Sequence, residues 1–360
     1  MKVDQPIFGP DGRVLIERGA FLDDFEIEGL LKKGIMSVYI TEGEPDDDEE
    51  VVISPAAQQT IAKTRVPDKK KVELSNEVKE RVGQGIKYLF DNTSNADFAE
   101  SSNSVAGELM DSIMSSDAVA FDINMLKVSD EYTFKHSVDV AAMSLIIGKN
   151  MGLPHEELKE LGVAGLLHDI GKSSIPDEIL NKKDKLTDEE FTYIKQHSVF
   201  GYKILTERGG FSEAVLRGVL QHHEKLNGRG YPLGVSGDKI HKYARIISVA
   251  DVYDALVTDR PYKKGFSKGV AVEMIMAMTE DLDMDAMNCF LHTVVAYPVD
   301  SIVTLVNGEK AKVVQNYMGY PLRPKVVSIT TGKVYDLSND LECASLIINE
   351  QKKGISKRDS

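Results

Sequence analysis

The sequence predicts a mainly α-helical protein with a small α+β module near its N-terminal end and a small β-subdomain near its C-terminal end. Apolar residues recur at helical spacing from about residue 72 to residue 289. After Pro298 the pattern changes to short apolar runs separated by glycine turns, which is typical of strands. With 360 residues, the chain is long enough for two or three domains.

The N-terminal module is expected over residues 1–45. Apolar runs at 13–16 and 37–40 predict strands of a hairpin, and the stretch 25–31 between them has the spacing of a helix. Residues 46–71 are expected to form a linker, because this segment begins with acidic residues and continues polar.

A helical domain is expected over residues 72–293. The β-subdomain should follow over 294–350, and its clearest element is a hairpin with strands at 301–306 and 311–314 around an Asn-Gly turn. The remaining residues, 351–360, form a basic tail.

Composition restricts the partners and the compartment. The formal net charge of -14 opposes unspecific binding to DNA or to anionic lipid, so an anionic substrate would need local positive charge. No apolar run reaches the length of a membrane span, and no signal peptide precedes the first domain. Cys289 and Cys343 suggest ordinary thiols in a reducing compartment. We therefore expect a soluble cytoplasmic protein, and both a monomer and a homodimer stay open.

The residues that indicate chemistry are histidines and aspartates within the helical domain. A single helical histidine is more often a surface or core residue than a metal ligand, but here several occur in one stretch. Neutral imidazole and carboxylate groups are preferred ligands of iron, manganese and zinc, and their number suffices for two ions. They are His136, His168, Asp169, His197, His222, His223 and Asp251.

Two adjacent pairs strengthen the metal interpretation. His168 and Asp169 end an apolar helical run, where an unpartnered charged pair would cost several kcal/mol to bury. Consecutive side chains on a helix diverge by about 100°, so this pair could straddle one ion or reach two, with Asp169 as a bridge. His222 and His223 precede the glycine-rich run NGRGYP, which we expect to form a rigid rim over the site.

The order of motifs H, HDIGK, H, HHE, NGxGYP and ADVYDALVTDRPYKK, over about residues 125–265, resembles the HD-GYP family of the HD phosphohydrolase superfamily. This resemblance implies an all-helical HD-type catalytic domain. It also implies two divalent metal ions, iron or manganese in preference to zinc. One ion would be held by His136, His168, Asp169 and Asp251, and the other by His197, His222, His223 and the bridging Asp169.

The implied activity is hydrolysis of a cyclic dinucleotide such as cyclic di-GMP, to linear pGpG, to GMP or to both. Two metal ions roughly 3.5 to 4 Å apart lower the pKa of a bridging water and clamp the oxygens of an in-line displacement at phosphorus, so a metal-activated hydroxide fits this reaction. Asp169 and Lys172 are the candidate catalytic residues. The candidate substrate contacts are Lys172, Arg260, Lys263 and Tyr231. Arg260 and Lys263 could instead form a solvated basic patch.

In the branch of this family that has trinuclear metal sites, a glutamate stands four residues before the first ligand histidine. Here that position is Tyr132, and Glu131 is one residue out of helical phase. A phenol with a pKa near 10 is a poor ligand at neutral pH, so we expect a dinuclear site.

Two alternatives remain open from the sequence. The first is an HD phosphohydrolase of another nucleotide, such as a cyclic GMP-AMP dinucleotide or a phosphomonoester intermediate. The second is an inactive module that binds a cyclic dinucleotide or a partner protein and signals through its flanks. Such a module would usually have lost a metal ligand, and none of the seven is lost here.

Overall fold

The computed structural model describes residues 7–8, 14–16, 30, 52–68, 74–115, 132–182, 184–259 and 264–350. The chain divides into two compact units, residues 1–53 and 54–360. In the first unit, β1 (Ile7–Phe8) pairs antiparallel with β2 (Val14–Ile16), which accounts for the predicted strand at 13–16. Leu30 is helical and buried. The predicted strand at 37–40 and the rest of the predicted helix lie outside the described residues.

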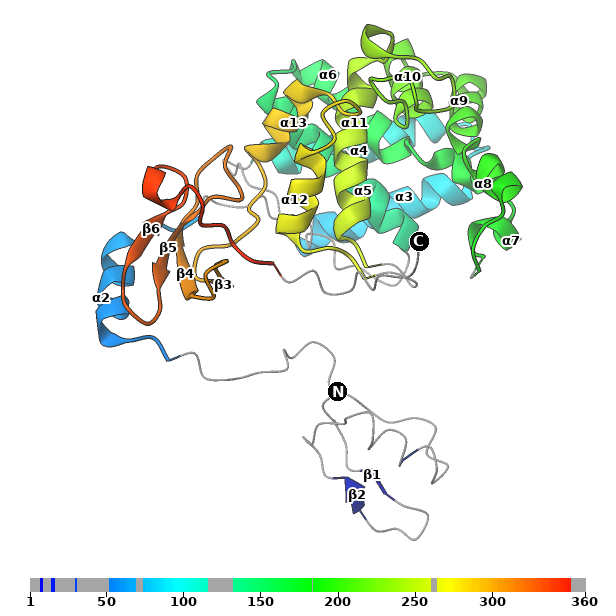
Figure 1. The fold of residues 1–360 in the computed structure, drawn as a ribbon. Helices are drawn as coiled ribbons and strands as arrows, with labels where there is room; N and C mark the ends of the chain where they lie inside the picture. Colours follow the sequence, from blue (N-terminus) through cyan, green and yellow to red (C-terminus); the bar gives the residue numbers. More distant parts are fainter. Residues whose placement is uncertain are drawn as a thin grey trace. The chain divides into compact units, whose positions relative to one another are not determined.

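The second unit is built mainly from helices, which confirms the predicted fold class (Figure 1). Within the residues described, no helix combines the length and the apolarity that a membrane crossing needs. The helices of its larger, helical part are α3 (Asn76–Asp91), α4 (Phe98–Met114), α5 (Tyr132–Asn150), α6 (His155–Leu167), η2 (Ile170–Ser174), α7 (Asp177–Leu180), α8 (Asp188–Ile194), α9 (His197–Arg208), α10 (Glu213–Gln221), η3 (Gly237–Lys239), α11 (Lys242–Val257), α12 (Lys268–Met276) and α13 (Met284–Leu291).

Helix starts follow from capping side chains in the sequence. Ser75, Thr187, Ser212, Ser267 and Asp283 each accept a hydrogen bond from a backbone N–H in the first turn of the helix that follows. Such caps satisfy donors that the helix itself leaves unpaired, and each stabilises its helix by about 1 kcal/mol.

Helix α5 is the centre of the hydrophobic core. It packs against α3, α4, α6, α11 and α13, and its residues from 136 to 148 are buried all round. A helix that is apolar on every side must lie inside the fold. The approach of α6 is especially close, because a Cβ atom on Gly165 would lie 2.9 Å from the Cα of Ala141. This contact brings the end of α6 beside the middle of α5.

A second close approach joins η2 to α9. A Cβ atom on Gly171 would lie 1.9 Å from the carbonyl oxygen of His197 and 2.4 Å from the backbone nitrogen of Gly201. Only glycine fits at such a distance. The segment that follows the His168-Asp169 pair is thereby pressed against the first turn of α9.

The C-terminal part contains an antiparallel sheet in the order β3-β4-β5-β6. Strands β3 (Ile302–Thr304) and β4 (Lys310–Gln315) form the predicted hairpin, in which Gly308 has a φ of 83°. Strands β5 (Lys325–Ser328) and β6 (Val334–Asp336) complete the sheet, and η4 (Leu341–Cys343) follows. A glycine turn, in which Gly332 has a φ of 73°, precedes β6.

Part of the expected linker 46–71 is instead a helix that belongs to this sheet. Helix α2 (Pro55–Thr64) packs on β4 and β5 (Figure 1), and Ser54 N donates to Ile329 O at 2.9 Å. The linker prediction was wrong here because it weighed the polar composition above the spacing of Ala57 and Ile61. These two residues lie four positions apart and bury one apolar stripe.

The packing of α2 predicts where the chain can be shortened. Removal of residues 1–53 should leave the melting temperature of the second unit nearly unchanged, because the cut falls between the two compact units. Removal of residues 1–64 should lower it by about 5 °C or more, because the sheet loses the apolar cover of α2. Thermal unfolding followed by circular dichroism compares the two truncations. Equal melting temperatures would contradict the structural role of α2.

Candidate metal centre

Three histidines of the candidate site share one local arrangement. The Nδ1 atoms of His168, His197 and His222 each lie 2.8 Å from the backbone carbonyl oxygen three residues earlier. His168 and His222 stand at the C-terminal ends of α6 and α10, and His197 is the first residue of α9. Donation from Nδ1–H fixes the tautomer and leaves the Nε2 lone pair directed at the site, as metal-binding histidines require.

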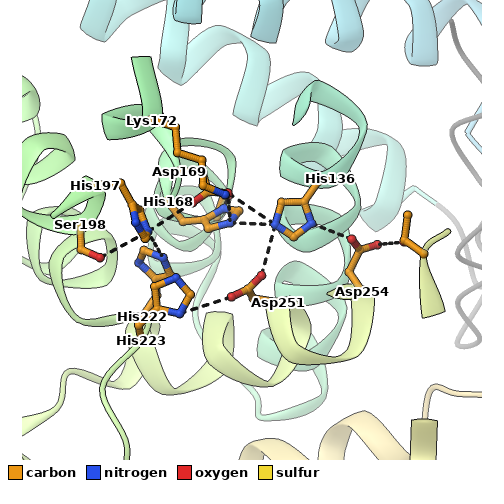
Figure 2. Close-up of polar contacts among 12 residues, drawn as sticks. His136, His168, Asp169, Lys172, His197, Ser198, His222, His223, Asp251 and Asp254 are labelled. Atoms are coloured by element: carbon orange, nitrogen blue, oxygen red, sulfur yellow. Dashed lines mark hydrogen bonds and ion pairs between the residues drawn. The ribbon is translucent and has the colours of Figure 1, made fainter. Parts of the chain in front are cut away.

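The Nδ1 atom of His136 is held by a side chain instead of a backbone carbonyl. Its Nδ1 lies 2.6 Å from Asp254 Oδ2, and Thr258 donates to Asp254 Oδ1 at 3.2 Å. Its Nε2 faces the site, 3.3 Å from His168 Nε2 and 3.2 Å from Asp251 Oδ1 (Figure 2). Asp254 therefore orients the ring of His136.

The carboxylate of Asp169 stands between two groups of donors (Figure 2). Its Oδ2 lies 3.6 Å from His136 Nε2 and 3.4 Å from His168 Nε2, whereas its Oδ1 lies 3.4 Å from His197 Nε2. Lys172 Nζ donates to Oδ2. The two oxygens thus point toward different histidines.

The donor atoms form two groups, each compact enough to surround one cation. Asp169, His197, His222 and His223 offer one ligand atom each within 4.8 Å of one another, and His136, His168 and Asp251 do the same. His223 Nδ1 lies 3.7 Å from Asp251 Oδ2, so the two groups adjoin.

The charges of the site favour bound cations. Burial lowers the pKa of His223 to about 3 and also holds the pKa of His222 well below its usual value, so both rings are neutral donors. Burial alone would raise the pKa of Asp169, but Lys172 and His168 outweigh it and hold that pKa well below the usual range. Burial disfavours protonation of His136, yet Asp251 and Asp254 outweigh it and raise the pKa to about 10, so without a metal this ring carries a second proton in the place that a bound cation would take.

The donor set fits divalent metal ions. Asp169 Oδ1 is buried without a hydrogen-bond partner in the described part of the chain, which is costly for a carboxylate oxygen. The Nε2 atoms of His197 and His222 lie 3.3 Å apart, and two lone pairs at that distance need a proton or a cation between them. Imidazole nitrogens and carboxylate oxygens suit iron, manganese and zinc.

The glycine-rich run forms the rim that the sequence predicts. The ring of Tyr231 lies over that of His223, with centroids 4.7 Å apart and planes at 30°. Glu224 Oε1 accepts hydrogen bonds from the backbone nitrogens of Leu233 and Gly234 at 2.6 and 3.1 Å. A Cβ atom on Gly230 would lie 2.4 Å from the Cα of Glu224, so the loop closes tightly on the histidine pair.

The structure brings together all seven residues that the sequence proposed as metal ligands. Lys172 lies beside Asp169 with its side chain 27% exposed, and Tyr231 covers His223. Arg260, Lys263 and Glu131 lie outside the described residues, as does the side chain of Tyr132, so the expected phosphate contacts of the basic pair and the expected absence of a third ion stay predictions.

Sequence reasoning missed Asp254. The available signal was its position three residues after Asp251, on the same face of one helix. It also missed Asp139, one turn after His136, whose oxygens are buried without a hydrogen-bond partner among the described residues. Burial and the charge of Asp254 raise the pKa of Asp139 well above its usual value, which favours its neutral form beside the His136–Asp254 pair.

Comparison with known proteins identifies the class. The family model described as "HD domain" matches residues 121–286. A cyclic di-GMP phosphodiesterase of Pseudomonas aeruginosa is 32% identical over 321 residues, which cover 86% of this chain and 78% of the relative. A cyclic di-GMP phosphodiesterase of Borreliella burgdorferi is 33% identical, over 61% of this chain and 58% of the relative.

Further relatives and a solved structure agree with this class. A 3'3'-cGAMP-specific phosphodiesterase of Vibrio cholerae is 39% identical over 153 residues, 40% of this chain and 33% of the relative. The fold is similar to that of an HDG"Y"P protein from Bdellovibrio bacteriovorus, with a TM-score of 0.51 and 19% identity over 81% of this chain and 94% of the other.

A helical body that encloses histidines and aspartates in this arrangement defines an HD-type domain. Within that class, the chain belongs to the HD-GYP family.

Replacement of Asp254 by asparagine should weaken metal binding by about 10- to 100-fold, because the partner of a ligating histidine sets its orientation and basicity. Calorimetric titration of metal-free protein with Mn²⁺ measures the affinity. The control is Asp285→Asn, which removes an exposed carboxylate on α13 far along the chain from the ligands. Unchanged Mn²⁺ affinity in Asp254→Asn would contradict the orienting role.

Proposed function

We propose that this chain is a metal-dependent phosphodiesterase that hydrolyses cyclic di-GMP. The carrying observation is the pair of adjoining donor groups that share the buried Asp169 carboxylate. The names of the Pseudomonas and Borreliella relatives supply the substrate. The proposed product is linear pGpG, GMP or both.

The proposed site holds two ions. The first would be bound by His136, His168, Asp251 and Asp169 Oδ2, and the second by His197, His222, His223 and Asp169 Oδ1. Divalent ions in these positions would supply Lewis acidity, which activates water and stabilises charge on phosphate oxygens. The donors are imidazoles and carboxylates, with no thiolate among them. Such a set is compatible with iron or manganese, which the family resemblance favours over zinc.

The protein residues have separate tasks in this proposal. Asp169 would hold both ions, because its two oxygens face different groups of donors. Lys172, on the turn after Asp169, is half-buried at the edge of the site and would donate to a phosphate oxygen as charge develops there. Tyr231 would exclude water above His223, and Arg260 with Lys263 would contact the substrate from the segment after α11.

The rival substrates differ in one base. A relative named as 3'3'-cGAMP-specific is 39% identical over 153 residues, which makes cyclic GMP-AMP the second candidate substrate. An inactive binding module is less well supported, because all seven proposed ligands are present and adjacent.

The proposal is tested by incubating metal-analysed protein with cyclic di-GMP and separating pGpG from GMP over time. We expect hydrolysis that stops when a chelator removes the metal and returns when Mn²⁺ or Fe²⁺ is added back. Cyclic GMP-AMP at equal concentration measures preference. Binding of cyclic di-GMP without cleavage by metal-loaded protein would support the inactive module instead.

Replacement of Asp169 by alanine should lower turnover by about a thousandfold or more, because one carboxylate serves both donor groups. Elemental analysis should find two metal ions per chain in the wild type and fewer in the variant. Substantial turnover with unchanged metal content would remove Asp169 from its bridging role. A third ion in anomalous diffraction would contradict the dinuclear site.

Replacement of Lys172 by alanine should leave both ions bound while kcat/KM falls by about 10- to 100-fold, the effect of one lost charged contact to phosphate. Lys172→Arg keeps the charge and should recover part of the activity. Loss of metal from Lys172→Ala, measured by the same elemental analysis, would instead assign this lysine to holding Asp169.

A further inference from the structure

Lys195 is a cation at the edge of the metal centre that the motifs do not include. It is the residue after α8, two positions before His197. Its Nζ lies 4.6 Å from the ring centroid of Phe191 and 5.6 Å from that of Tyr231. The ammonium group is therefore within cation–π range of two aromatic rings, and this attraction limits its freedom.

Tyr231 connects this lysine to the donor groups. Its ring lies over that of His223 and meets the ring of His197 edge-on, with centroids 6.3 Å apart. Tyr231 thus contacts both Lys195 and two of the proposed metal ligands. A substrate group that Lys195 contacts would lie beside the Tyr231 ring, because this lysine forms no ion pair with Asp169 or Asp251.

Lys195 also differs from neighbouring lysines in its charge balance. Lys182 Nζ lies 2.7 Å from Glu190 Oε1, and Lys225 Nζ lies 2.7 Å from Asp281 Oδ2, so carboxylates compensate both. Lys195 makes no ion pair with any residue in the described part of the chain, and it is only half-buried. In a protein with a net charge of -14, an uncompensated cation beside the site is available to an anionic ligand.

A cyclic dinucleotide carries two phosphates on opposite sides of one ring. When one phosphate is at the ions, the other is held away from them by the ribose and base groups. We propose that Lys195 binds this second, non-reacting phosphate and thereby makes the site selective for dinucleotides over simple phosphodiesters. The inference rests on the proposed function and adds a specificity-determining residue to it.

The test compares two substrates in the metal-loaded full-length protein: cyclic di-GMP, and bis(p-nitrophenyl) phosphate, which has a single phosphate. Lys195→Met keeps the aliphatic stem on the aromatic rings but removes the charge. Its KM for cyclic di-GMP should rise about tenfold, the effect of one lost charged contact, with kcat within about twofold of wild type. Its hydrolysis of bis(p-nitrophenyl) phosphate and its metal content should not change.

Two further variants control for charge and for folding. Lys195→Arg keeps the cation and should have a KM for cyclic di-GMP near that of wild type. Lys203→Met removes an exposed lysine of α9 on a later turn than His197 and should change neither substrate. Added NaCl should raise the KM of wild type for cyclic di-GMP more steeply than that of Lys195→Met, since salt screens the contact that the variant lacks.

The outcomes separate this inference from the proposed function. An unchanged KM for cyclic di-GMP in Lys195→Met, or an equal loss on both substrates, would overturn the role of Lys195 while wild-type cleavage upholds the proposed function. Failure of the wild type to cleave cyclic di-GMP, with bis(p-nitrophenyl) phosphate still hydrolysed, would overturn both.

Discussion

The buried carboxylate of Asp169 is the constraint on which the rest of the helical body depends. An ionised group in the interior is tolerated only when charge and hydrogen bonds compensate it, and here one oxygen still has no hydrogen-bond partner in the described part of the chain. Histidines from separate helices surround it with their Nε2 atoms. The polar centre of this core is therefore organised to hold positive charge, which would offset the cost of burying the carboxylate.

Two close backbone contacts impose that geometry. Gly165 lets α6 touch α5 beside Ala141, and Gly171 lets η2 touch α9 at His197. A side chain at either glycine would separate the helices, and the imidazoles on them would move apart. The positions of the donor atoms thus depend on the tight packing of the helices, because dense interiors transmit small displacements.

The flanks of the catalytic body belong to the same architecture. The match to the Pseudomonas relative extends well beyond residues 121–286, and the likeness to the Bdellovibrio fold covers 81% of the chain. Helix α2 contributes to the sheet although it precedes the helical body in sequence, so the β-subdomain is assembled from both sides of that body.

The sequence alone identified the histidines and aspartates that the fold brings together. Adjacent His-Asp and His-His pairs at the ends of apolar helices are hard to explain without a metal, and the hairpin around Asn307-Gly308 follows from local turn preference. Local hydrogen bonds to the carbonyl three residues back then fix three of the rings. These features depend on neighbours in the chain, so a pattern of residues can reveal them.

Only the tertiary structure decided what brings the donors together and what supports them. The two oxygens of Asp169 face different groups because α5, α6, α9, α10 and α11 converge there, and no spacing in the sequence encodes that convergence. Asp254 and Lys195 look like ordinary charged residues of helix surfaces until their partners His136 and Tyr231 are seen across the fold. Helix α2 was missed for the same reason. Its short apolar stripe is buried only by packing on β4 and β5, which lie far away in the sequence.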